Sequence, residues 1–378
     1  EAATCDRWLT ALDQIFMPKG EVVGKGGRIL NPQEAANECA DFLQEFVGAC
    51  LMGWAPTFQQ MLLLYGRGSN GKSVIIDVVA AMFPKEMRSN TTPQALSGRD
   101  SQDAVANLHN KRLCYFADIP AGDLLNSSNL KALIGGDTIE GREVYQRRLS
   151  FESEAGFFYS ANELPPSRDN TDGFWRRIVA LPMVNRFHKT DPGFDAHLKK
   201  RIIATELEGI YAWAIRGVRR LLERGYYNVP AVAHQTKQAW KRASNPFAHW
   251  VEECVGEVAV DLNTSNPAHW TTADMLFKSY SRWTRDSGLR PTGLPRFQTR
   301  FGELNLKARR GRRNDLLPKE KSRQRRVYPV RLYAHELRRL KQLNAINDVE
   351  NHVISALCGS VDAEGFDPDL RPINQDVQ

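Results

Sequence analysis

The stretch LLLYGRGSNGKSVIIDVV, residues 62–79, decides the fold class of this chain. An apolar run, residues 61–65, leads into a glycine-rich loop, after which apolar residues recur at helical spacing from Val74 to Met82. This order predicts a strand, a loop and a helix. The loop reads G-x-x-x-x-G-K-S, and its glycines let backbone N–H groups converge on phosphate oxygens at the positive end of the helix. The sequence therefore predicts a phosphate-binding loop in an α/β fold.

The polar residues of this loop have expected roles. The Lys72 side chain is expected to reach the β- and γ-phosphates, and the Ser73 hydroxyl to take one Mg²⁺ coordination position. The predicted cofactor contacts extend over the whole loop: Gly66, Arg67, Gly68, Ser69, Asn70, Gly71, Lys72 and Ser73. A purely structural glycine-rich turn is the alternative, but it leaves the flanking strand and helix unexplained. We therefore expect ATP and Mg²⁺ as ligands.

Composition narrows the class of protein. The 378 residues, 42% of them hydrophobic, suffice for two or three domains with cores of their own. No apolar run approaches the roughly 20 residues of a membrane helix, and the first ten residues carry no signal-peptide pattern, so we expect a soluble cytoplasmic protein. The six cysteines are far apart and form no C-x-x-C pair, which argues against a zinc site or a disulfide framework.

Positive charge gathers towards the C-terminus. Residues 296–331 hold 13 Lys and Arg against 3 Asp and Glu, in a chain of net charge +7. Turn residues at Gly311 and strand formers between residues 327 and 332 predict a basic hairpin after helices, as in a winged helix. The candidate contacts to duplex DNA are Arg309, Arg310, Arg312 and Arg313. A solvated charged loop is the alternative. The acidic residues 346–378 are expected to be disordered beyond about residue 360.

Three further short apolar runs, residues 113–117, 156–161 and 178–181, are strand candidates. Asp118 follows the first run, where a P-loop ATPase needs an acid to hold Mg²⁺. Asn162 follows the second, where an amide can contact the γ-phosphate or orient water, with a turn cap as its alternative role. Arg176 and Arg177 precede the third, and either can stabilise charge on a transferred phosphoryl group or lie in a salt-bridged surface.

The combination of these motifs resembles the superfamily 3 helicases, in particular the phage, plasmid and poxvirus primase-helicase group. The matching residues are Asn70, Asp118, Gly135-Gly136-Asp137, Arg142, Asn162, Pro165 and Arg176-Arg177. Residues 33–55 look like the helical segment before the motor, and residues 270–301 look like its C-terminal winged-helix segment. The resemblance covers most of residues 1–335. It implies an AAA+-like P-loop motor, and a bacterial host or a phage-infected cell as the setting.

The resemblance also implies a mechanism. Such motors form rings, usually hexamers, in which Arg176 or Arg177 reaches the ATP of the neighbouring subunit. They translocate on single-stranded DNA and unwind duplex DNA. The segment between residues 135 and 150 is expected to form a channel hairpin, with a salt-bridged surface helix as the alternative. Its candidate DNA contacts are Arg142, Tyr145, Arg147 and Arg148. A primase domain or a separate primase partner is compatible with this reading, although nothing between residues 1 and 60 resembles a primase.

The expected domains are a helical oligomerisation or collar segment (1–55), the motor (56–228), a basic winged-helix-like domain (229–345) and the acidic tail (346–378). One feature departs from the family. Helicases of this type often carry two adjacent acids, whereas this strand reads Phe116-Ala117-Asp118-Ile119, so Asp118 acts alone or Asp123 or another carboxylate supplies the base. This leaves two alternatives open: an origin-binding initiator that uses ATP only as a switch, and a small-molecule P-loop kinase.

Overall fold

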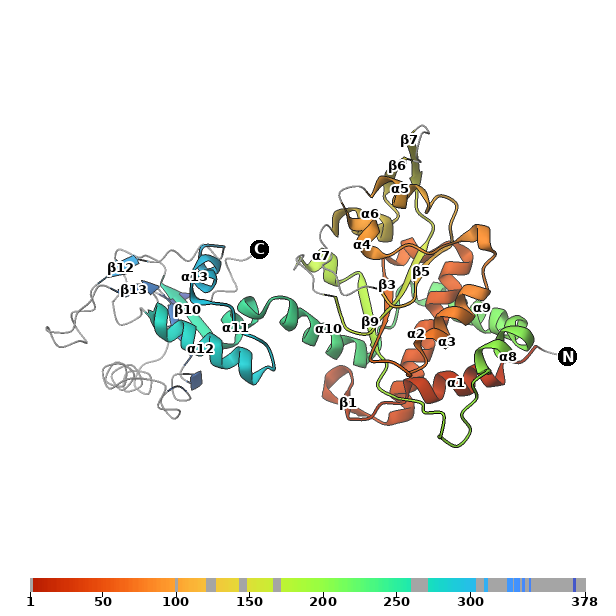
Figure 1. Ribbon diagram of the computed structural model, residues 1–378, viewed down its shortest axis with the longest axis horizontal. Coiled ribbons are helices and arrows are strands. Elements are labelled where there is room, and N and C mark those ends of the chain that lie inside the picture. Colours follow the sequence, from red (N-terminus) through yellow and green to blue (C-terminus); the bar gives the residue numbers. More distant parts are fainter. Residues whose placement is uncertain are drawn as a thin grey trace. The chain divides into compact units, whose positions relative to one another are not determined.

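The computed structural model describes residues 3–98, 101–119, 127–142, 148–165, 171–259, 271–303, 309–311, 325–328, 330–333, 335–336, 340 and 370–371. The chain divides into two compact units, Glu1–Ser244 and Asn245–Gln378, each of which is described by itself (Figure 1). Within the described residues, no helix has the length and apolar character needed to cross a membrane.

A parallel five-stranded sheet forms the centre of the first unit. Its order is β4 (Arg88–Ser89), β5 (Leu113–Phe116), β8 (Gly156–Ala161), β3 (Met61–Tyr65) and β9 (Ile178–Pro182). All neighbouring pairs run parallel. β8 is buried along its whole length, as expected for a strand whose two faces are both covered by helices. The α/β class and the strands expected from the four apolar runs are confirmed.

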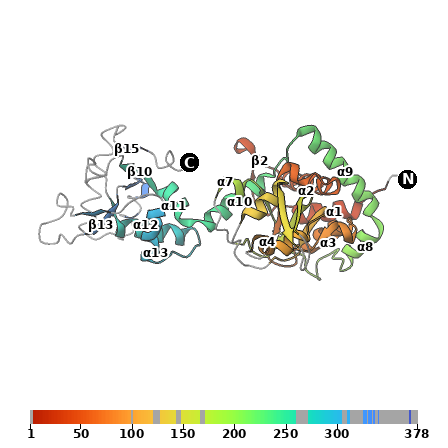
Figure 2. The ribbon, with the colours of Figure 1, turned by 90° about the horizontal axis from the view of Figure 1, so that it is seen from above.

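Alternate residues of these strands enter two different cores, because successive side chains point to opposite faces of a sheet. Leu62 and Leu64 of β3 join one core, while Met61 and Leu63 join the other. The first face is covered by α1 (Asp6–Phe16), α2 (Pro32–Met52), α3 (Lys72–Ala81), α8 (Leu198–Thr205) and α9 (Leu207–Arg224). Figure 2 shows α1, α3, α8 and α9 on one side of the yellow strands.

The second face carries shorter helices, and a longer helix follows the edge strand β9. The short helices are α4 (Pro93–Ser97), α5 (Gln102–Ala106), α6 (Ser127–Gly135) and α7 (Asp172–Trp175). Along β9 lies α10 (Ala231–Ser244), whose Trp240 packs edge-on against Trp175 and donates a hydrogen bond to the Pro165 carbonyl at 2.9 Å. The first unit therefore extends to Ser244, beyond the boundary expected at residues 228 and 229.

The N-terminal helices are part of the same unit as the sheet. The α2 helix begins at Asn31, whose side chain accepts a hydrogen bond from the Glu34 N–H at 2.8 Å, while the Glu34 carboxylate accepts one from the Asn31 N–H at 3.2 Å. Before it lie α1 and a small ladder of β1 (Val22–Val23) and β2 (Ile29–Leu30), joined by η1 (Lys25–Gly27). The helices α1 and α2 of this N-terminal segment contribute to the core on one face of the sheet.

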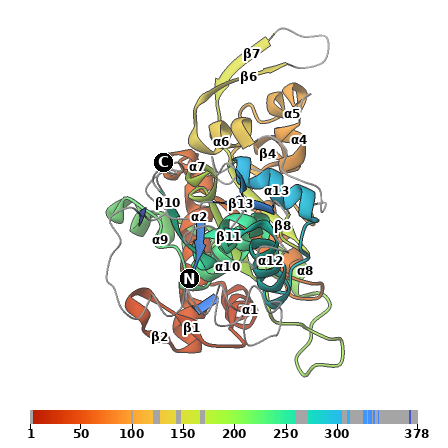
Figure 3. The ribbon, with the colours of Figure 1, turned by 90° about the vertical axis from the view of Figure 1, so that its left-hand side faces the viewer.

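A two-stranded antiparallel hairpin extends from the first unit. It consists of β6 (Thr138–Arg142) and β7 (Arg148–Glu152), with Arg142 paired opposite Arg148 at the end furthest from the sheet (Figure 3). The hairpin expected between residues 135 and 150 is confirmed, and the surface-helix alternative is wrong for the described residues. The connection, residues 143–147, lies outside the described residues and includes Tyr145 and Arg147.

The second unit packs helices against short strands around an aromatic core. Its helices are α11 (Pro246–Cys254), α12 (Ala273–Asp286) and α13 (Leu294–Glu303). Its strands are β10 (Val255–Ala259), β11 (Thr271–Thr272), β12 (Arg309–Gly311), β13 (Arg325–Tyr328), β14 (Val330–Leu332) and β15 (Leu370–Arg371). Phe297 is enclosed by Phe247, Trp250 and Tyr280. The basic segment contributes the antiparallel pair β12–β13, so the predicted basic hairpin is confirmed in these strands.

Two sequence predictions for the second unit fall largely outside the described residues. Arg312 and Arg313 lie there, as do the side chains of Arg309 and Arg310. Of residues 346–378, only β15 is described, and its pairing with β10 shows that these two residues are in a strand rather than in a disordered tail.

Two close helix contacts in the first unit require glycine. A Cβ on Gly48 of α2 would lie 2.8 Å from the Val218 Cβ of α9, and it would also collide with the Ala214 carbonyl. A Cβ on Gly217 of α9 would lie 2.7 Å from the Gln44 backbone carbonyl carbon of α2. The two helices therefore pack with their backbones in near contact.

Replacing Gly48 by alanine is expected to lower the free energy of unfolding by about 1–3 kcal/mol, because the added methyl group forces the two helices apart. Gly20→Ala is the matched control, since no atom lies within 4 Å of the Cβ position of Gly20. Chemical denaturation of both variants tests this. Equal stabilities of Gly48→Ala and Gly20→Ala would show that the α2–α9 contact can open at no cost.

Candidate functional site

The predicted loop connects β3 to α3 and is named here the glycine loop, residues 66–71. Gly66, Ser69 and Gly71 have φ values of 149°, 59° and 88°, in the region that favours glycine. A Cβ on Gly71 would also collide with the Ile15 side chain of α1. Gly68 has no atom within 4 Å of its Cβ position and no positive φ, so the structure does not require a glycine there.

Lys72, the first residue of α3, turns its side chain back under the glycine loop and is largely buried. Its ammonium group donates to the Gly66 carbonyl, to Asn70 Oδ1 at 3.1 Å and to Asn162 Oδ1 at 3.4 Å. Burial lowers the pKa of Lys72, and the Asp118 carboxylate partly offsets this by raising it. All three acceptors are neutral oxygens. The charge of Lys72 is thus solvated by the loop and remains available to an anion.

The polar residues after β5 and β8 meet beside Lys72, because these strands and β3 are parallel neighbours whose carboxyl ends share one edge. The Asn162 side-chain amide donates to Asp118 Oδ1 at 2.7 Å. The Asp118 N–H donates to Ser160 Oγ at 3.1 Å, and Asp118 itself has φ 67°. Lys72, Asn162 and Asp118 therefore form one hydrogen-bonded chain.

Ser160 is a site residue that the sequence pattern did not single out. It is buried within β8, and its hydroxyl fixes the backbone of Asp118, which lies in a conformation uncommon for a residue other than glycine. A serine inside an otherwise apolar strand, two residues before the polar strand end, is the signal by which it could have been found.

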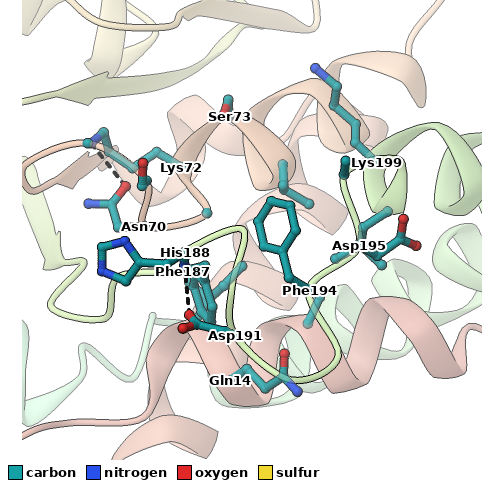
Figure 4. Close-up of a pocket in the computed structure, with 18 of the residues that line it drawn as sticks. Gln14, Asn70, Lys72, Ser73, Phe187, His188, Asp191, Phe194, Asp195 and Lys199 are labelled. Carbon is teal, nitrogen blue, oxygen red and sulfur yellow. Dashed lines mark hydrogen bonds between the residues drawn. The ribbon is translucent and has the colours of Figure 1, made fainter.

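A cavity of about 920 Å³ opens over the glycine loop and the strand ends (Figure 4). Besides the predicted residues, α1 and the segment 187–199 line it. Neither was expected at the site from the sequence. The segment is joined to the glycine loop by a hydrogen bond from the Phe187 N–H to the Ser69 carbonyl at 2.7 Å.

The same cavity holds the two residues expected to bind Mg²⁺, Ser73 and Asp118. One hydroxyl and one carboxylate suit this ion, which usually keeps water and phosphate oxygens as its other ligands. Within the residues that the structure describes, no group of three or more His, Cys, Asp and Glu side chains could hold a metal.

Arg176 and Arg177 lie at the other end of the sheet. The Arg177 carbonyl accepts a hydrogen bond from the Met61 N–H at the beginning of β3, whereas the glycine loop follows the end of that strand. A strand of this length separates the two places by about 15 Å. Within one chain, therefore, the structure does not bring these arginines to Lys72.

The two arginines differ in their surroundings. Arg177 is partly buried, and its Nη1 donates to the Gly173 carbonyl at 2.8 Å. Burial lowers the pKa of Arg177, as does the charge of Arg176, while Asp137 raises it. Arg176 is exposed, and its Nη2 donates to Gln59 Oε1 at 3.4 Å. Arg177 is thus anchored within its own unit, and Arg176 is accessible from outside.

On the hairpin, Arg142 and Arg148 are both exposed and lie opposite each other. Arg148 also forms an ion pair with Glu140 at 3.6 Å, in which both side chains are largely solvated. Such exposed pairs contribute little to stability, so the Arg148 guanidinium is free to exchange partners.

Residues 64–177 match a family of unknown function, DUF5906. This range contains the site residues described above, apart from those of α1 and of the segment 187–199. The putative helicase L207/L206 of Acanthamoeba polyphaga mimivirus is 29% identical over 154 residues, which make up 39% of this chain and 16% of that protein. The putative primase C962R of African swine fever virus (strain Badajoz 1971 Vero-adapted) is 29% identical over 140 residues, with coverages of 35% and 14%. The putative helicase 121R of Invertebrate iridescent virus 3 is 23% identical over 247 residues, with coverages of 58% and 26%.

These relatives are consistent with the primase-helicase group that the motifs resemble, and this resemblance is confirmed. The chain spans about a quarter or less of the length of the relatives named above. Two solved apo structures of the NrS-1 C-terminal region align with TM-scores of 0.48 and 0.46 and identities of 12% and 13%. Both alignments cover 88% of this chain, and they cover 77% and 76% of the respective NrS-1 chains. The strand order and the parallel pairing of the central sheet define the α/β fold.

Replacing Gly71 by alanine is expected to weaken binding of inorganic tripolyphosphate at least about tenfold, because the methyl group meets Ile15 and the backbone has a positive φ. Gly68→Ala is the matched control within the same loop. Isothermal titration calorimetry measures the affinities, and thermal unfolding of both variants identifies any loss of fold. Unchanged tripolyphosphate affinity of folded Gly71→Ala protein would contradict the role of the glycine loop.

Proposed function

We propose that this chain is the ATP-hydrolysing motor of a DNA replication helicase, built as an AAA+-like P-loop domain with a winged-helix unit after it. The observation that carries the proposal is the hydrogen-bonded chain Lys72–Asn162–Asp118, which lies beside the glycine loop at the carboxyl edge of a parallel sheet. Phosphoryl transfer needs a cation, an oxygen ligand for Mg²⁺ and a polar group for water at one place. The names of the viral relatives support the same class of protein.

The residues of this site have distinct tasks in the proposed reaction. Lys72 leaves its neutral acceptors for the β- and γ-phosphates, which are stronger partners for an ammonium group. Ser73 and Asp118 would hold Mg²⁺, which would supply positive charge to offset the negative charge that develops on the phosphate oxygens. Asn162 keeps Asp118 in place through one amide hydrogen and is near enough to Lys72 to orient the γ-phosphate or the attacking water.

Hydrolysis in this account needs a second copy of the chain. The arginine expected to stabilise the transferred phosphoryl group is separated from the glycine loop of its own subunit by the length of β3, about 15 Å. A ring, a hexamer as the family resemblance implies, supplies it from the neighbouring subunit. Of the two candidates, we assign the finger to Arg176, because it is exposed, whereas Arg177 is tied to Gly173 in its own unit.

DNA is the proposed polymeric substrate. Arg142 and Arg148 lie at the end of the β6–β7 hairpin, where cationic side chains can contact the phosphates of single-stranded DNA. The basic strands β12 and β13 of the second unit are proposed to contact duplex DNA, as the wing of a winged helix does.

An ATP-switched initiator is the second candidate, and one observation favours it. Asp118 is the predicted Mg²⁺ ligand, and hydrolysis needs a further carboxylate to activate water. Among the described residues, the other two aspartates that line the cavity have partners of their own, and Asp123, the other candidate base, lies outside the described residues. Asp191 accepts from the His188 N–H at 2.7 Å, and Asp195 pairs with Arg201 at 3.3 Å. Phosphate release that increases with DNA would exclude this switch, and a ring assembled with a nonhydrolysable ATP analogue would exclude a small-molecule kinase.

Lys72→Ala is expected to abolish ATP hydrolysis and to leave the fold intact. Although Lys72 is largely buried, it lines the cavity and belongs to neither hydrophobic core, so its removal takes away phosphate contacts without opening a core cavity. Lys85→Ala, which removes an exposed lysine elsewhere in the first unit, is the control. Phosphate release and circular dichroism of both variants test the expectation. Hydrolysis by Lys72→Ala near the wild-type rate would refute the proposed function.

Arg176→Ala is expected to bind ATP but to hydrolyse it at least about 100-fold more slowly, as fingers elsewhere contribute larger factors. Mixing Arg176→Ala with Lys72→Ala protein should restore part of the activity, because a hybrid ring contains interfaces with an intact loop and an intact finger. Single-turnover hydrolysis measures both effects. If only Arg177→Ala loses turnover, the finger is Arg177, and if neither does, the finger assignment fails.

Changing Arg309, Arg310, Arg312 and Arg313 to alanine is expected to weaken duplex DNA binding and to lower its log–log salt slope by roughly 0.9 per lost phosphate contact. A variant in which the exposed residues Lys19, Lys25, Arg28 and Lys85 become alanine has the same change in net charge and is the control. Fluorescence anisotropy at several salt concentrations measures affinity and slope. The same affinity and slope in the two variants would remove the support for a DNA-binding wing.

A further inference from the structure

One wall of the cavity consists of residues that have no role in the proposed phosphate chemistry. Gln14 and Ile15 of α1 and Phe194 of the segment 187–199 line it. Figure 4 shows the Phe194 ring between α1, which carries Gln14, and the helix that carries Ser73.

The α1 side of this wall is fixed at both ends by residues far away in the sequence. At its beginning, the buried carboxylate of Glu206 accepts hydrogen bonds from the Arg7 N–H at 3.2 Å and the Trp8 N–H at 3.0 Å. At its end, the Asn185 side-chain amide donates to the Gln14 carbonyl at 2.9 Å and the Met17 carbonyl at 2.7 Å. These contacts satisfy backbone groups that a helix leaves without partners, and they hold α1 against the site.

The segment 187–199 is attached to the phosphate-binding elements. The Phe187 N–H donates to the Ser69 carbonyl at 2.7 Å, and Lys199 pairs with Asp77 of α3. Between these anchors, the Phe194 ring remains 39% exposed although it faces a cavity. An aromatic ring held in this way offers a flat apolar surface to a planar ligand.

Gln14 supplies a side-chain amide to the wall. Its side chain is exposed to the cavity, and its amide makes no hydrogen bond to another described residue. A glutamine amide can accept from N6 of adenine and donate to N7, whereas guanine presents two acceptors at the corresponding positions. The pairing therefore favours adenine.

We propose that α1 and the segment 187–199 form the base subsite of the nucleotide site, in which Phe194 stacks on the base and Gln14 selects adenine over guanine. This proposal deepens the proposed function and rests on it. Because the segment 187–199 is attached to the glycine loop and to α3, a base bound between this segment and α1 also couples α1 to the phosphate site.

Binding of ATP, GTP and inorganic tripolyphosphate by the full chain tests the proposal, with isothermal titration calorimetry as the readout. Phe194→Ala is expected to bind ATP and GTP at least about tenfold more weakly, with unchanged affinity for tripolyphosphate, since only the base loses a contact. Phe194→Tyr should restore nucleotide affinity. Tyr226→Ala, which removes an exposed aromatic side chain outside the cavity, is the control.

Gln14→Leu is expected to reduce the preference for ATP over GTP at least about fivefold, again with unchanged tripolyphosphate affinity. Gln235→Leu, a change at an exposed position of α10, is the control. Wild-type protein that does not distinguish ATP from GTP, or Gln14→Leu with the wild-type preference, overturns the role of Gln14.

The outcomes separate this proposal from the proposed function. If Lys72→Ala loses nucleotide binding but Phe194→Ala binds ATP like the wild type, the base subsite is wrong and the phosphate site stands. If wild-type protein binds neither ATP nor tripolyphosphate, both proposals are overturned.

Discussion

β8 hydrogen-bonds to β3 on one side and to β5 on the other, and the three strands run in the same direction. This pairing brings together side chains that are 44 and 90 positions apart in the sequence, as the Asn162–Asp118 and Lys72–Asn162 hydrogen bonds show. Parallel strands end at one edge, so the polar residues after them converge there. The cavity, the placement of Lys72 and the proposed chemistry all depend on this arrangement.

The same constraint explains why one subunit is not sufficient in the proposed mechanism. Arg176 and Arg177 precede β9, and β9 is parallel to β3, so they lie at the edge opposite the glycine loop. A change of side-chain conformation alone cannot bring either arginine to the glycine loop, because the length of a strand, about 15 Å, separates them. A motor that uses one of these arginines must therefore place a second subunit next to the cavity over the glycine loop of the first subunit.

The sequence predicted the parts of the site that rest on local patterns. The glycine loop, the strands around it and the polar residues at their ends follow from hydrophobic periodicity and from the spacing of a few residue types. The β6–β7 hairpin and the basic strands were also predicted. By contrast, the α1 wall depends on Glu206 and Asn185, whose partners are 168 or more positions away. Such contacts leave no periodic signal. The spacing of apolar residues in α10 likewise indicates that Trp240 lies on a buried face of the helix. It does not indicate whether this face packs against the first unit or the second.

In the proposed mechanism, the ATP site is completed between two copies of the chain. The most direct test of this mechanism is a cryo-electron microscopy structure of the protein with a nonhydrolysable ATP analogue, Mg²⁺ and single-stranded DNA. We expect a ring in which the γ-phosphate contacts Lys72 of one subunit and Arg176 of its neighbour. A nucleotide bound away from the glycine loop, or a γ-phosphate with no arginine from a second subunit near it, would refute the proposed mechanism.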